Sequence, residues 1–269
     1  MANPPIRELA EIVQLQKGRH RRPDDGVCAM ELVAWMSGER HSDHPQSVSP
    51  IIAAFTRSFN DSLDAEPRQR LGALTARMIG TRGTRWEEAE RCQVLWDWMI
   101  TTAVPAWLAA AQRPDLAAAV ASDRAAALDS VIVALDAYGH APVRRVDDHR
   151  ISSMVSDSLG ASGVTGACLA GRDAADDASG SRARRRWESA RVVVRAAAWF
   201  VAELEAAGDE HIPTPLARTI DGLRESAFAM LERLIGADES DLAPPPYPVP
   251  TAATTYVWSP DAARGVVNV

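Results

Sequence analysis

Hydrophobic positions recur with helical spacing along most of the chain, and no two segments alternate as paired strands would. Apolar residues three and four apart form one face of an amphipathic helix, whereas a half-buried strand alternates every second residue. The pattern therefore predicts an all-α protein. The predicted helices cover residues 28–37, 50–61, 64–80, 85–104, 114–120, 122–138, 183–207 and 214–236.

Local signals mark where several of these helices begin and end. Ser49 followed by Pro50 is a typical N-cap and first helical residue. Thr84 and Glu87 have the spacing of a capping box, in which each side chain accepts a hydrogen bond from the other residue's backbone amide. Pro105 is expected to end or kink the fourth helix, because it removes a backbone hydrogen bond.

Composition divides the helical part of the chain into three regions. Residues 1–138 are predicted to form a compact helical domain, and residues 182–236 a helical hairpin that docks on it or on a second subunit. Between them, residues 139–181 are rich in Gly, Ser, Asp and Ala. Such a composition predicts a linker or long loop, with no more than a helical turn near residues 151–159.

Residues 237–269 are predicted to form an extended proline-rich tail. Prolines are dense between residues 244 and 250, which excludes a helix and favours polyproline II geometry. The tail is expected to wrap over a surface or to present Tyr247 and Trp258 to a partner, with disorder as the alternative.

Charge and cysteine content narrow the classes of function. The net charge is −7, which argues against nucleic-acid binding because such proteins carry a basic footprint. The three cysteines form no C-x-x-C pair, which favours a reduced compartment. The N-terminus has no signal-peptide pattern, and no apolar run has transmembrane length. We therefore expect a cytoplasmic protein that does not enter membranes.

The densest group of reactive side chain types lies between residues 18 and 61. If this group is catalytic or ligand-binding, Cys28 is a nucleophile or metal ligand, with His20 or His44 as its base or co-ligand. Cys28 lies at the start of a helix, where unpaired amides and the helix dipole lower a thiol pKa. The candidate residues are His20, Cys28, Glu31, Asp43 and His44.

A structural role fits the same residues and is favoured. Cys28 and Glu31 are three residues apart and share a helix face with Trp35, which predicts burial. Cys28 is then a small buried apolar residue. Glu31 holds the loop of residues 42–50 through hydrogen bonds, and Asp43 caps or turns that loop.

Two further groups are weaker candidates. Asn60 and Asp61 close the second helix, where such a pair usually ends the helix and bonds its own backbone, with ligand binding as the alternative. A cluster of arginines at the start of the helix at 183–207 could meet phosphate or nucleic acid, although solvated charge is common there. Its members are Arg182, Arg184, Arg185 and Arg186.

Neither a metal nor a cofactor is predicted. The spacing of His20, Cys28, His41 and His44 matches no standard zinc module. The chain also lacks a phosphate-binding glycine loop, a dinucleotide fingerprint and the motifs of common hydrolases.

The region from residue 18 to residue 61 contains the pattern Gly18-x-His20, Gly26-x-Cys28-x-Met30-Glu31, Gly38-Glu39, Ser42-Asp43-His44-Pro45, Ser49-Pro50 and Asn60-Asp61. This pattern resembles a group of uncharacterised actinobacterial and actinophage proteins over roughly the first 115 residues. No activity is established for this group, so the resemblance implies none for this chain. Its members often carry Cys where this chain has Ser47, so a thiol pair with the equivalent of Cys28 would be lost here.

These observations favour a non-enzymatic interaction, scaffold or regulatory protein, phage-derived and oligomeric. Trp96 and Trp98 point to different sides of one helix, so one of them is expected to be exposed or at an interface. The alternative is a thiol- or carboxylate-dependent enzyme, or a small-ligand binder, that uses residues 18–61. The expected partner is another protein or a second copy of this chain.

Overall fold

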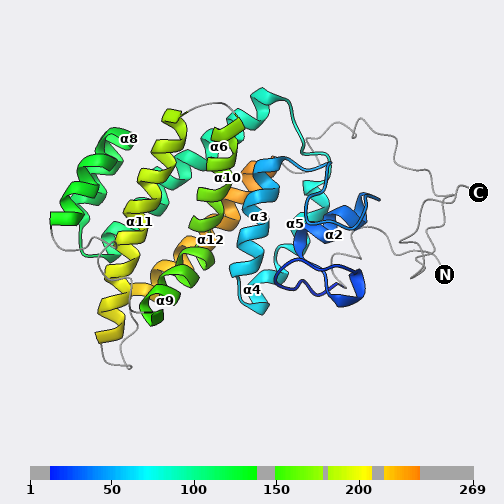
Figure 1. Cartoon of the computed structure of the whole chain (residues 1–269), viewed down its shortest axis with the longest axis horizontal. Helices are drawn as coiled ribbons and strands as arrows, with labels where there is room; N and C mark the ends of the chain where they lie inside the picture. The colour runs from blue at the N-terminus through cyan, green and yellow to red at the C-terminus, as the bar shows by residue number, and fades with distance from the viewer. Residues whose placement is uncertain (1–12, 138–148, 178–180, 208–214, 237–269) are drawn as a thin grey trace, which may run out of the picture.

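The computed structural model describes residues 13–137, 149–177, 181–207 and 215–236. Every regular element in these ranges is helical, which confirms the predicted all-α class (Figure 1). After a short 3-10 turn at Pro23–Asp25, the elements are α2 (Ala29–Met36), α3 (Pro50–Ser62), α4 (Ala65–Gln69), α5 (Gly72–Met78), α6 (Arg85–Trp98), the π-helical turn η2 (Met99–Ala103), α7 (Val104–Ala110), α8 (Pro114–Ala137), α9 (His149–Ala161), α10 (Val164–Asp177), α11 (Ser181–Ala207) and α12 (Pro215–Ile235).

One continuous hydrophobic core joins the N-terminal and C-terminal helices. α10 packs between α3 and α11 (Figure 1), and α12 packs against α6, α7 and α11. The Phe59 ring of α3 contacts the Phe55 ring at a centroid distance of 5.4 Å and the Phe228 ring of α12 at 5.1 Å. The predicted C-terminal hairpin therefore packs on the N-terminal part of the same chain.

The structure corrects the predicted linker of residues 139–181. Residues 149–161 form α9 and residues 164–177 form α10, and both helices contribute to the core. Part of the predicted linker, residues 139–148 and 178–180, lies outside the described residues.

Small residues in this region allow close helix packing, which is why their abundance does not indicate a loop. A Cβ atom at Gly166 would lie 3.0 Å from the backbone oxygen of Phe55. A Cβ atom at Gly171 would lie 2.1 Å from Cε2 of the buried Trp187. Glycine permits such close approach because it has no Cβ. α10 can therefore lie deep in the core between α3 and α11.

The local start signals are confirmed, but two helix boundaries differ from prediction. Ser49 and Thr84 cap α3 and α6, and the helix widens into the π-helical turn η2 just before Pro105. Residues 64–80 form two helices instead of one. Residues 114–137 form one helix instead of two. Ser122, between the two predicted helices, lies inside it, and its hydroxyl donates to the Ala118 carbonyl one turn earlier.

The burial of the tryptophan side chains of α2 and α6 differs from the prediction. Trp96 and Trp98 are both buried, because α6 is covered on two sides. Trp96 meets the Trp187 ring of α11 edge-on at 4.9 Å, and the Trp98 indole N–H donates to Ser226 of α12 at 2.8 Å. Trp35, predicted on the buried face of α2, is 41% exposed.

Candidate functional site

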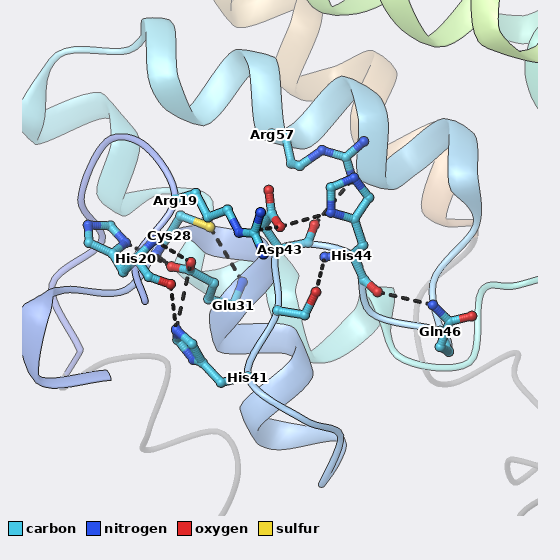
Figure 2. A network of polar contacts seen from close by, with 10 residues as sticks. Arg19, His20, Cys28, Glu31, His41, Asp43, His44, Gln46 and Arg57 are labelled. Carbon is cyan, nitrogen blue, oxygen red and sulfur yellow. Dashed lines mark hydrogen bonds and ion pairs between the residues drawn. The ribbon is translucent and has the colours of Figure 1, made fainter. Parts of the chain in front are cut away.

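The Glu31 carboxylate is the centre of the network in Figure 2. Glu31 lies in the first turn of α2 and is completely buried. Its Oε2 accepts hydrogen bonds from the Cys28 amide and from Nδ1 of His20, both at 2.8 Å. Its Oε1 accepts a bond from the His20 amide at 2.6 Å. Nε2 of His41 lies 3.7 Å from Oε1 and 3.1 Å from the His20 backbone oxygen.

These donors stabilise the charged form of Glu31. Burial by itself raises the pKa of a carboxyl group. The hydrogen bonds from the Cys28 amide and from the amide and ring of His20 outweigh it, so the pKa of Glu31 lies below its ordinary value. The buried carboxylate thus orders the backbone of residues 20–28 around α2.

The lowered pKa predicts how the contribution of Glu31 to stability depends on pH. A group with a lower pKa in the folded state stabilises the protein above its unfolded pKa, about 4.3 for Glu, and loses that effect as pH falls through the folded value. Urea denaturation of wild type and Glu31→Gln should therefore show a stability gap that is full at neutral pH and shrinks below about pH 4. A gap of constant size across this range would count against the hydrogen-bonded carboxylate.

Cys28 is the N-cap of α2. Its Sγ accepts a hydrogen bond from the Glu31 amide at 3.5 Å, and the Glu31 carboxylate accepts one from the Cys28 amide, which completes a capping box. Burial is the main reason that the pKa of Cys28 is raised to about 12, and the Glu31 charge adds to it. The thiol therefore stays protonated, contrary to the lowered pKa expected at a helix start. A protonated thiol is a poor nucleophile and metal ligand.

Gly26 is required for the loop that brings His20 to Glu31. Its φ of +134° lies in a region that other residues rarely adopt. A Cβ atom there would lie 2.5 Å from Oε1 of Gln16 and 2.6 Å from Nε2 of His20. The loop is closed by a hydrogen bond from the Gln16 amide to the Val27 carbonyl at 2.9 Å. Any side chain at Gly26 would therefore displace His20.

Asn60 and Asp61 bond the N-terminal loop, and not their own backbone as predicted. They lie in the last turn of α3, which continues to Ser62. The fully buried Asn60 donates to the Gln16 carbonyl at 2.9 Å and accepts from the Ala29 amide at 3.3 Å. Asp61 accepts from the Gly18 amide at 2.7 Å. The pair therefore fastens the loop to α3, and the Asn60 side chain is occupied by protein groups.

Asp43 and His44 form a second carboxylate–histidine pair beside the first (Figure 2). Oδ1 of Asp43 lies 2.8 Å from Nδ1 of His44 and 3.5 Å from Nε of Arg19. The turn predicted for Asp43 is made by Ser42, whose hydroxyl accepts from the His44 amide at 3.1 Å. Arg57 of α3 donates to the Asp43 carbonyl at 3.2 Å. The His44 side chain is 61% exposed and the Asp43 side chain 12%, so His44 is the accessible member of this pair.

Glu39 performs the role that was predicted for Glu31. Its carboxylate accepts hydrogen bonds from the Gln46 and Ser47 amides, the latter at 2.9 Å, and thereby holds the loop that leads to α3. Hydrogen bonds from residues 37, 46 and 47 lower the pKa of Glu39, although burial opposes them. The sequence signal for Glu39 is its place directly after Gly38, where a helix ends.

Arg68 and Gln69 of α4 also hold the region together, and neither was a predicted candidate. Gln69 accepts from the Leu15 amide at 2.8 Å and donates to the Leu15 carbonyl at 3.0 Å. The buried Arg68 donates to the Asn60 carbonyl at 2.9 Å and to the Leu63 carbonyl. These bonds satisfy carbonyls at the end of α3 that lack helical partners. No local sequence pattern identifies either residue.

The remaining candidates lie elsewhere. The Arg186 guanidinium lies over the Trp96 ring, 4.6 Å from its centroid, in an intramolecular cation–π contact. Among the described residues no group of three or more His, Cys, Asp or Glu is arranged to hold a metal ion, and none of their helices is long and apolar enough to cross a membrane. Tyr247 and Trp258 lie outside the described residues. The other three arginines of the predicted cluster are exposed on α11: Arg182, Arg184 and Arg185.

The site is thus a set of side chains that hold two loops, one around the start of α2 and one between α2 and α3. Glu31 holds residues 20–28, Asn60 holds residues 16–29 and Glu39 holds residues 46–47. Comparison with protein-family models, with curated proteins and with solved structures found no match to this chain.

Proposed function

We propose that the protein is a non-enzymatic helical scaffold or regulatory protein that binds a protein partner or a second copy of itself. The burial of the Glu31 carboxylate is the observation that supports this proposal. Its carboxylate is fully buried and accepts three N–H bonds at 2.6–2.8 Å. A catalytic carboxylate or thiol must meet its substrate, whereas Glu31 and Cys28 are both buried.

Exposed apolar side chains support a role in binding. They occur on five helices of the described part, and tryptophan is enriched at protein interfaces. The resemblance of residues 18–61 to actinobacterial and actinophage proteins supports a phage-derived origin. The three cysteines, which form no C-x-x-C pair, support a cytoplasmic location. The exposed side chains are Trp35, Trp86, Val133, Leu169 and Leu204.

Thiol reactivity tests the non-enzymatic part of the proposal. In the folded protein at neutral pH, iodoacetamide should alkylate Cys28 at least about a hundred-fold more slowly than in the urea-unfolded chain, because burial keeps the thiol protonated. Mass spectrometry of digested samples measures the rate at each cysteine, with the half-buried Cys92 as the internal comparison. Fast labelling of Cys28 in the folded state would favour the thiol-enzyme alternative.

Cross-linking in cells and sedimentation of the full chain test the binding part. We expect either a self-associated species or one stoichiometric protein partner, with cross-links on the outer helices. Sedimentation over about a hundred-fold range of concentration distinguishes self-association from partner binding. A chain that stays monomeric throughout and cross-links to no protein in its native cells would rule the proposal out.

A further inference from the structure

Trp86 is the most exposed large apolar side chain among the described residues. It lies in the first turn of α6 and is 83% exposed. Tryptophan contributes more contact area than any other side chain when it is covered, and it is enriched among the residues that dominate protein–protein binding. The start of α6 lies at the upper edge of the molecule in Figure 1. Trp86 therefore stands where a partner can reach it.

The next two turns of α6 extend the surface around Trp86. Residues three, four and seven positions apart lie on one side of a helix. Ala89, Glu90 and Gln93 have these spacings from Trp86, and all are exposed. The opposite side of the helix, with Leu95, packs into the core. The residues at 86, 89, 90 and 93 thus form one outward side, which we call the outer face of α6.

The charges change sign along the outer face. The exposed Arg82 and Arg85 lie at its start, and the exposed Glu90 lies five residues after Arg85. That separation is about 7.5 Å along the helix axis. Glu87 lies about 100° around the helix from Trp86, on the flank of the face, and its carboxylate accepts a hydrogen bond from the N-cap amide. The face itself therefore runs from positive to negative, with Trp86 between.

A surface of this kind is complementary to itself when two copies run antiparallel. In a twofold interface each residue meets the counterpart of its own contact, so a contact from i to j is repeated from j to i. A twofold axis level with residues 87–88 places Trp86 opposite the small Ala89 of the second copy. The same axis places Arg85 level with Glu90 of the second copy. Opposite charges then meet at both ends of the contact.

We propose that two copies of this chain associate through the outer face of α6, with Trp86 at the centre. A different protein would need both signs of charge in the reverse order, which a second copy already provides. A contact made mainly by one helix pair lies at the small end of specific interfaces, so the dimer is reversible and depends on concentration. This inference rests on the proposed function and names its partner and its surface.

Sedimentation of the full chain from about 1 μM to about 1 mM measures the dissociation constant of the dimer. Trp86→Ala should raise this constant at least about thirtyfold, because the two central side chains of the interface are lost. The matched control is Val133→Ala on α8, where an apolar side chain 69% exposed is truncated. The control should dimerise as wild type does.

Reversal of the charges tests the antiparallel pairing itself. Arg85→Glu and Glu90→Arg should each raise the dissociation constant about tenfold, since like charges then face each other across the axis. The double variant should return to within about threefold of wild type, because the pair is restored with its signs exchanged. Arg218→Glu, an exposed reversal in the first turn of α12, should have no effect.

Two results would overturn this interface, and both can be told apart from failure of the proposed function. A chain that stays monomeric up to about 1 mM has no such dimer, whereas a stoichiometric cross-link to another protein in cells would still support the proposed function. A dimer that Trp86→Ala and both single charge reversals leave unchanged must use another surface, and self-association would then stand without the outer face of α6.

Discussion

Replacing Glu31 by Gln should lower the free energy of unfolding by about 3–5 kcal/mol, because it removes a buried charge to which two amides and a histidine donate. The Gln amide group also turns N–H donors toward the donors of Cys28 and His20. For a chain of this size the melting temperature should fall by about 10 °C. Urea denaturation and calorimetry both measure the loss.

Glu90→Gln is the matched control for this change. Glu90 is exposed on α6, and surface substitutions of this kind stay within about 0.5 kcal/mol of wild type. If Glu31→Gln were as mild as Glu90→Gln, the carboxylate would not be holding residues 20–28, and the structural role of Glu31 would have to be abandoned.

Replacing Gly171 by Ala should lower the free energy of unfolding by about 2–3 kcal/mol, although alanine favours a helix by itself. The new Cβ would lie 2.1 Å from Cε2 of Trp187, whose indole is buried and packed edge-on against Trp96. The Trp187 ring cannot retreat without disturbing the α6–α11 contact. Chemical denaturation of the purified variant measures the effect.

Gly222→Ala is expected to have the opposite effect on the free energy of unfolding. Gly222 lies on the exposed side of α12, and a Cβ there meets no atom within 4 Å. This variant should be as stable as wild type or more stable by about 0.5–1 kcal/mol, because glycine costs a helix conformational entropy. If both glycine variants gained stability alike, α10 would not be packed against α11 as the structure has it.

Local signals predicted the all-α class and the start of most helices. A capping residue acts over one helical turn, so the caps at Ser49 and Thr84 can be recognised from three or four neighbouring residues. The packing of one helix on another cannot be recognised in this way. In the sequence, Gly166 and Gly171 are typical of a loop. In the folded protein, Phe55 and Trp187 occupy the space that a side chain at these positions would need.

The same limit applies to the candidate site. The sequence pattern predicts that Cys28 and Glu31 share a buried helix start, but it assigns the wrong loop to the Glu31 carboxylate, residues 42–50 instead of residues 20–28. Two of its three donors are backbone amides, which every residue carries, and the histidine reaches it through a loop whose path depends on Gly26. The sequence therefore favours a structural role for Glu31 but cannot identify the loop that it holds.

Amide hydrogen exchange at His20 and Cys28 tests the anchoring role of Glu31 most directly. If the buried carboxylate holds both amides, they should exchange as slowly as the core amides of α3, and Glu31→Gln should speed their exchange by more than about a hundred-fold. Exchange in wild type at the rate of an unstructured loop would contradict it, because the carboxylate would then be open to water and free to act on a substrate.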